Sequence, residues 1–394
     1  MPSRANLSIR TILGLLIGTT GLLLVVLSAF ALFEAASHHA GARRVAASTI
    51  TSQQLFKSML ALRLERGGII GGLLSEAPID SKSEADNLSN RGISETAYVD
   101  SIQSLTELDL PELASAISGL KAAHDAVVSL RTKADVAVRQ PRSAREPAIV
   151  QDWPKTTQSL LDAILATAGP LEEALKLFDP KVDHFLAIKQ AAWTTRLNLG
   201  LMALRLQAAV ALNKPLTPAD TLIWYQDRAH AAAAWSIVTT AAARRDAPAA
   251  LVDSVAKSNV NFVGRLADFQ QAIVDAFVAG RKVDVSFVDL QRSNTEGTTL
   301  ANVVLDTAMD KMVATADAEA AQATRQMSLN AVVLLVALGL SVAGFLVVRR
   351  RVSRPILALT ATIEHLAQQD FSVEIPAKTR DDEVGRMQTA LLVL

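Results

Sequence analysis

The chain has 394 residues, equal numbers of basic and acidic side chains, 50% hydrophobic residues, 4% aromatic residues and no cysteine. The balanced charge offers no basic surface to a nucleic-acid partner. A domain without cysteine cannot use disulfide bonds and must be held together by packing alone. Because aromatic residues are few and alanine is abundant, the composition favours an all-α fold over a β-sheet core.

Two apolar runs without charged residues, Thr11 to Phe33 and Met327 to Val348, stand near the two ends of the chain. Each exceeds the roughly 20 residues that a helix needs to cross a bilayer, so we expect transmembrane helices at 11–33 and 327–348. The first run is also longer than the 7–15 apolar residues of a usual secretory signal.

Arginines near the two runs predict the orientation of the chain. The flanks that face away from the central segment hold Arg4, Arg10, Arg349, Arg350, Arg351 and Arg354, and the inner flanks hold Arg43, Arg44 and Arg325. Because positive charge concentrates on the cytoplasmic side, residues 1–10 and 349–394 are expected in the cytoplasm. Residues 34–326 would then form a periplasmic sensor domain of a bacterial inner-membrane protein.

Helix-forming residues dominate between the spans, and alternating β-branched residues are nearly absent. Prolines and glycines divide this segment, and 139–152 is expected to be a solvated linker. We expect eight helices, near 34–76, 84–108, 111–139, 154–178, 181–213, 218–245, 248–279 and 286–348. The outer two would continue into the spans. Eight such helices suggest a double four-helix bundle, with two four-helix layers stacked away from the membrane.

The helix near 34–76 carries two arginines three residues apart, Arg63 and Arg66, which therefore emerge on one face. Turned inward, their guanidinium groups would bind a small oxyanion or carboxylate. Turned outward, they would be a solvent-facing pair beside Glu65. Arg196 and Arg205, on a later helix, could supply further cations to the same ligand.

The Arg-x-Glu-Arg-Gly stretch that begins at Arg63 resembles the first helix of nitrate- and nitrite-sensing domains, which are also eight-helix double bundles. The long helical segment also resembles the helical bimodular sensors of chemoreceptors, which bind small organic acids. Both resemblances imply a small anionic ligand. Glycines follow the motif in pairs four residues apart, at Gly67, Gly68, Gly71 and Gly72. They permit the close approach of another helix, or they weaken the end of this one.

The segment after the second span contains two heptad seams joined by a connector with alternating apolar residues. The first seam is Ile356, Leu359, Ile363 and Leu366, directly after Pro355. The connector holds Phe371, Val373 and Ile375, and the second seam holds Val384, Met387, Leu391 and Leu394. One copy of the chain would leave both seams exposed, so we expect a parallel coiled-coil bundle in a homodimer.

This arrangement resembles a HAMP domain, the relay that follows the last transmembrane helix of bacterial chemoreceptors and sensor kinases. The resemblance rests on Pro355, the connector and the start of the second helix at Glu383, Val384 and Gly385. It covers 349–394, with a second helix shorter than is usual. The carboxylates Asp381, Asp382 and Glu383 are better explained by helix capping than by a metal site.

These features predict a receptor that senses a small, anionic solute outside the inner membrane. The HAMP segment would relay the change to a cytoplasmic chemotaxis output, as in a methyl-accepting chemotaxis protein, and a kinase or adaptor would be reached only through a further output module. The sequence leaves open the sensory half of a membrane histidine kinase or diguanylate cyclase, and also a structural or adaptor membrane protein. No nucleophile–base pair, Walker motif or metal-spaced cluster occurs, so neither enzymatic activity nor a cofactor is expected.

Overall fold

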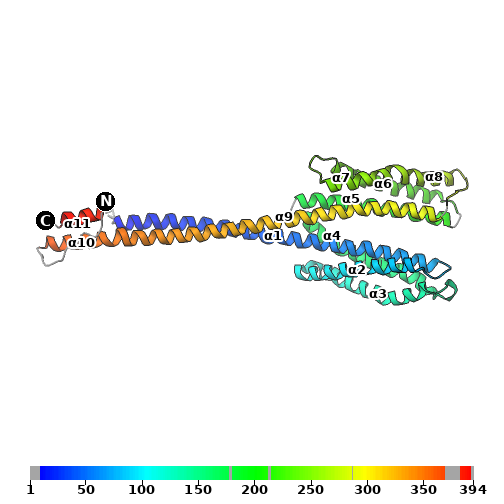
Figure 1. Cartoon of the computed structure of the whole chain (residues 1–394), viewed down its shortest axis with the longest axis horizontal. Coiled ribbons are helices and arrows are strands. Elements are labelled where there is room, and N and C mark those ends of the chain that lie inside the picture. The colour runs from blue at the N-terminus through cyan, green and yellow to red at the C-terminus, as the bar shows by residue number, and fades with distance from the viewer. Residues whose placement is uncertain (1–8, 177–179, 212–213, 286, 369–381, 392–394) are drawn as a thin grey trace, which may run out of the picture. The chain divides into compact units, whose positions relative to one another are not determined.

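A computed structural model of the chain describes residues 9–176, 180–211, 214–285, 287–368 and 382–391. Within these ranges the protein is all-α and has no strand (Figure 1). The helices are α1 (Ile9–Leu74), α2 (Ser81–Leu108), α3 (Ala114–Val138), α4 (Pro147–Lys176), α5 (Pro180–Ala211), α6 (Pro218–Ala242), α7 (Ala249–Asn259), α8 (Leu266–Val278), α9 (Phe287–Val348), α10 (Arg354–Ala367) and α11 (Glu383–Leu391). Short 3₁₀ turns lie at Pro111–Leu113 and Arg142–Ala144, and π-helical turns at Val260–Arg265 and Arg349–Ser353.

The chain divides into two compact units. We call Gly41–Ala320 the bundle unit, and Met1–Ala40 together with Ala321–Leu394 the stem unit. Helices α1 and α9 each belong to both units as single uninterrupted helices. The expectation that the first and last helices continue into the apolar runs is therefore confirmed.

The bundle unit consists of two four-helix groups, α1 to α4 and α5 to α9, in which α7 and α8 together make one arm. The groups lie side by side instead of in stacked layers. Gln53 on α1 donates to Asp310 on α9 at 2.7 Å, and the rings of Phe56 on α1 and Trp193 on α5 meet edge to face at 5.6 Å. One apolar core runs through both groups. Buried residues along both helices, such as Leu55 and Leu73 on α1 and Leu290 and Met312 on α9, show that their apolar faces are covered by this lateral packing.

A helical stripe on α1 shows how the sequence drives this packing. Leu55, Met59, Leu62, Ile69 and Leu73 follow helical periodicity and are each at most 2% exposed. Full burial of such side chains contributes about 1.5–3 kcal/mol apiece relative to exposure. The stripe therefore anchors α1 in the first group.

The glycine pairs on α1 serve close helix approach at two of their four positions. A Cβ atom on Gly68 would lie 1.9 Å from Asn87 Oδ1 on α2, and one on Gly72 would lie 3.1 Å from Val138 Cγ1 on α3. The other members of the pairs, Gly67 and Gly71, face open space. Close packing of α2 and α3 on α1 thus requires glycine at 68 and favours it at 72.

The expected start of a helix near residue 154 is wrong. Helix α4 begins at Pro147, so part of the expected 139–152 linker is helical, and it continues through Pro154 and through Gly169-Pro170. An internal proline costs about 3 kcal/mol in an isolated helix. Burial of Trp153 and Leu171, each at most 1% exposed, holds α4 together at these points.

Arg145 lies in the expected solvated linker but is only 7% exposed, so that expectation is wrong at this residue. Its guanidinium donates to the carbonyls of Leu73 at 2.8 Å, Ala77 at 3.0 Å, Ala137 at 3.1 Å and Gln140 at 2.7 Å. These carbonyls lie at or just after the ends of α1 and α3, where helices leave acceptors unpaired. A charged side chain therefore ties the two helix ends together.

In the stem unit, α1 and α9 run antiparallel. Asn330 Nδ2 donates to the carbonyl of Ala31 at 3.1 Å, and Ser341 Oγ donates to that of Gly21 at 3.3 Å. Both helices are long and apolar enough to cross a membrane, and only 6% of each apolar window is buried. Large side chains such as Phe30 and Leu335 are 66% and 67% exposed.

Candidate functional site

Three of the four predicted arginines meet at the centre of the bundle unit. The guanidinium carbon of Arg63 on α1 lies 5.0 Å from the ring centre of Trp193 on α5, and that of Arg196 lies 5.7 Å from the same ring. One turn further along α1, Arg66 Nη1 donates to Gln158 Oε1 on α4 at 2.9 Å. We call Arg63, Arg66 and Arg196 the arginine cluster.

The arginine cluster holds positive charge that no described carboxylate pairs with. Burial lowers the pKa of Arg63, as does the charge of Arg66, while Asp162 acts in the opposite direction. Burial together with the charge of Arg63 lowers the pKa of Arg196 to about 10. Each shift means that the folded protein disfavours the charged form. A bound anion would relieve that penalty.

The hydrogen-bond donors of the arginine cluster also indicate that an anion would fit there. Arg63 Nε and Arg66 Nε are buried and have no hydrogen-bond partner in the described part of the chain. Arg196 Nε donates to Asn302 Oδ1 on α9 at 2.8 Å. Buried donors are normally paired, and guanidinium forks match carboxylates and oxyanions. Helices α1, α4, α5 and α9 thus supply side chains to one electropositive site.

Arg205 does not join the arginine cluster. Its Nε lies 3.4 Å from Asp227 Oδ2, and its Nη1 lies 3.9 Å from Asp220 Oδ1, both on α6. Nine residues separate Arg196 from Arg205, which places the second arginine on the opposite face of α5. Its charge is compensated there.

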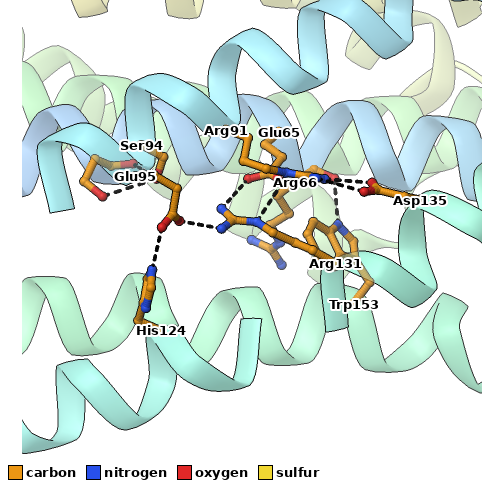
Figure 2. A network of polar contacts seen from close by, with 10 residues as sticks. Glu65, Arg66, Arg91, Ser94, Glu95, His124, Arg131, Asp135 and Trp153 are labelled. Atoms are coloured by element: carbon orange, nitrogen blue, oxygen red, sulfur yellow. Dashed lines mark hydrogen bonds and ion pairs between the residues drawn. The ribbon is translucent and has the colours of Figure 1, made fainter. Parts of the chain in front are cut away.

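Glu65 points toward Arg91 on α2 and Arg131 on α3 (Figure 2). It is fully buried and accepts hydrogen bonds from Arg91 Nε at 2.7 Å and from Arg131 Nη2 at 2.7 Å. Arg91 also forks onto Asp135 at 2.7 and 2.8 Å. Glu65 is therefore not the partner of Arg63 or Arg66, because its carboxylate accepts from other arginines.

The same network continues through Glu95, which contacts Arg131 and lies 2.9 Å from His124 Nε2 (Figure 2). Burial raises the pKa of Glu95, but the hydrogen bonds and charges of His124 and Arg131 outweigh it and lower the pKa to about 2. This network of carboxylates and bases joins α1, α2 and α3. The sequence offered one sign of it, since Arg131 lies on the buried stripe of α3.

A second buried ion pair, which the sequence analysis missed, lies between the two groups. Lys189 on α5 is fully buried and contacts Glu172 on α4, and its Nζ is 3.3 Å from Ser52 Oγ on α1. It also lies over the ring of Phe56. Burial lowers the pKa of Lys189 to about 8, against the opposing effect of Glu172. Lys189 and Arg196 share one heptad stripe, a pattern that could have revealed both.

The described part of the predicted relay comprises α10 and α11. Pro355 is the second residue of α10, and Asp382 Oδ1 accepts the backbone N–H of Gly385, which confirms capping of α11. Leu359 is 2% exposed, Ile356 and Val384 are partly buried, and Glu383 pairs with Arg386 at 3.2 Å. Ile363 and Met387 remain 46% and 51% exposed. The connector residues Phe371, Val373 and Ile375 lie outside the described residues, as do the side chains of Leu366 and Leu391.

Comparison with known families identifies this last segment. Residues 347–393 match the HAMP domain family. The chain carries a HAMP domain. This domain indicates a signal-transducing sensor protein, with the HAMP region as its relay. Among curated proteins and among solved structures, none matches the chain.

No group of three or more metal-ligating side chains occurs within the described ranges. The arginine cluster brings three partly buried positive charges together within the described part of the bundle unit.

Proposed function

We propose that this protein is a transmembrane receptor in which the arginine cluster binds a small anion. The observation that carries the proposal is the convergence of three guanidinium groups without a carboxylate partner among the described residues. They lie on α1 and α5, and α9 contributes Asn302. Because α1 and α9 are also the helices with the apolar runs, a ligand here would act directly on both.

Membrane insertion is supported by the exposure of the apolar windows of α1 and α9. A core helix of a soluble protein buries such a window, whereas here only 6% of each is buried. Lipid would cover these surfaces at no hydrophobic cost. The arginine distribution supports an orientation with residues 34–326 outside the inner membrane and the HAMP domain in the cytoplasm.

The relay follows from differential affinity. A ligand that binds one arrangement of α1 and α5 more tightly than another shifts the population toward that arrangement. An anion between Arg63 and Arg196 would favour close approach of the two helices, because it cancels their repulsion. A shift of a few kcal/mol is enough for such coupling. Helix α9 would carry the change to the HAMP domain.

A homodimer fits the HAMP domain. Ile363 and Met387 are apolar seam residues that one copy of the chain leaves 46% and 51% exposed. Knobs-into-holes packing against a second copy would bury them. For the output we propose a chemotaxis system, with the solute response conveyed through this dimer to a cytoplasmic kinase or adaptor.

The test uses the full chain in detergent micelles, with sodium nitrate and sodium acetate as probes and sodium chloride at equal ionic strength as the reference. Selective binding to the folded state adds about 2.7 kcal/mol at a concentration 100 times the Kd, so the Tm should rise. Arg63→Gln and Arg66→Gln should abolish the rise. Arg44→Gln, at an exposed position on the same helix, should preserve it.

Without a probe, Arg63→Gln should leave the protein at least as stable as wild type, because it removes a partly buried charge that is repelled by a neighbour. The proposal is wrong if neither probe raises the Tm above the chloride reference. It is equally wrong if the rise survives in both glutamine variants.

A further inference from the structure

The second four-helix group contains a cavity of about 440 Å³, which is separate from the arginine cluster. It lies between α5, α6 and the arm formed by α7 and α8. Its lining includes Leu199, Trp224, Arg228, Trp235, Phe262 and Gln270. The volume falls within the range of small-molecule sites, and the lining is mostly apolar with a few polar groups, as such sites require.

Trp224 lines this cavity and carries a buried donor without a partner among the described residues. The side chain is fully buried, and its indole Nε1 has no hydrogen-bond partner among the described residues. A buried donor left unpaired costs about 1–3 kcal/mol, and native proteins seldom leave one without a role. A ligand with an acceptor group would satisfy it.

Arg228 supplies a positive charge at the same wall. Its guanidinium carbon lies 5.7 Å from the ring centre of Trp224, and its Nη1 donates to the uncharged amide of Gln271. No described carboxylate pairs with it. An indole N–H and a guanidinium are both donors, so the acceptor that fits them best carries negative charge.

From these features we propose that the cavity binds a small amphipathic carboxylate with an aromatic or branched apolar body. The carboxylate would accept from Trp224 Nε1 and Arg228. The body would lie against Leu199, Trp235 and Phe262, where apolar burial and ring contacts stabilise it. Exposed residues at the rim, among them Ala232 and Asn259, leave a side open for entry.

The cavity wall is in direct contact with α9. Leu266 lies so close to Gly297 that a Cβ atom there would be 2.3 Å from Leu266 Cδ2. Gln270 Nε2 donates to Asn294 Oδ1 on α9 at 2.8 Å. The wall also includes Phe262, which lies in the kinked segment Val260–Arg265 between α7 and α8. A ligand in the cavity would therefore change the contacts of α9, the helix that leads to the HAMP domain.

Isothermal titration of the full chain in micelles, with phenylacetate and indole-3-acetate as probes, tests the proposal. We expect saturable binding of at least one probe, and at least tenfold weaker binding of 2-phenylethanol, which lacks the charge. Trp224→Phe keeps the ring but removes the donor, and Arg228→Gln removes the charge. Each should weaken probe binding at least tenfold, in keeping with the loss of a hydrogen bond to a charged group.

A matched control tests whether the loss of any nearby positive charge would weaken probe binding. Arg245→Gln, at an exposed position after α6, should bind the carboxylate probe as wild type does. Far-ultraviolet circular dichroism checks that each variant is folded. Arg228 is only partly buried, so its variant tests the proposal even if Trp224→Phe does not fold. Absence of saturable binding by both probes would overturn the proposal, as would wild-type affinity in Arg228→Gln.

Discussion

Glu65→Gln is the most informative single change in the first four-helix group. The Glu65 side chain is 0% exposed, and its two oxygens accept from Arg91 Nε at 2.7 Å and from Arg131 Nη2 and Nε at 2.7 and 3.0 Å. Glutamine has the same shape but turns one acceptor into a donor that faces a guanidinium N–H. The substitution therefore removes charge and hydrogen bonds without creating a cavity.

The expected loss can be estimated from these contacts. One hydrogen bond between charged groups contributes about 1.5–3 kcal/mol, and breaking a buried ion pair from one side costs about 3–5 kcal/mol. Arg91 keeps Asp135 and Arg131 keeps Glu95, which limits the penalty. We expect a loss of about 3 kcal/mol and a Tm lower by roughly 6–12 °C.

Urea unfolding followed by tryptophan fluorescence measures this loss, because all four tryptophans lie in the bundle unit. Glu112→Gln is the matched control, since Glu112 is exposed in the turn before α3, and it should change the free energy of unfolding by less than about 0.5 kcal/mol. A loss below about 1 kcal/mol in Glu65→Gln would refute the assignment of Glu65 as the central acceptor of a buried network.

Three further predictions concern packing, the linker and pH. Gly68→Leu should lower the free energy of unfolding in urea by about 1–3 kcal/mol, because the space beside residue 68 is filled by Asn87. Gly67→Leu should not lower it, because Gly67 faces open space. Equal losses in the two variants would contradict the close packing of α2 on α1 at Gly68. Arg145→Ala should lower the free energy of unfolding by at least about 3 kcal/mol, because the hydrogen bonds of Arg145 to helix-end carbonyls are lost. Arg142 is exposed, so Arg142→Ala should lower it much less. The pKa of Lys189 is lowered to about 8, so between about pH 8 and its ordinary value the unfolded chain binds more protons than the folded one. Stability should therefore rise with pH in that window by roughly 3 kcal/mol relative to Lys189→Met, and parallel pH profiles of the two proteins would disprove it.

Much of the secondary structure could be predicted from local sequence. Helix-forming residues and prolines located most helix ends to within a few residues, as at α2, α3 and α6. Pro154 misled because tertiary burial of Trp153 outweighs the penalty of an internal proline. The arm near 248–279 is interrupted by a π-helical turn with a non-helical Gly264, which no periodicity indicated.

The HAMP domain was recognisable in advance because its features follow one another along the chain. Proline, seam, connector and acidic helix start lie within one short segment, and the family match covers 347–393. The arginine cluster could not be predicted in this way, because its residues come from distant parts of the chain. Arg63 and Arg66 share a face by spacing alone, but their meeting with Arg196 depends on how α5 lies along α1.

The amino-acid sequence by itself determined the helices, the two apolar runs and the relay, because each depends on residues within a few helical turns of one another. Only the tertiary structure decided the destinations of the charged side chains. Glu65 pairs with Arg91 and Arg131, and Lys189 pairs with Glu172. Arg63 and Arg196 lie near one another with no ion-pair partner among the described residues. The reason is physical: the energy of a charge depends on its burial and on its neighbours across helices, and periodicity along one helix does not specify these.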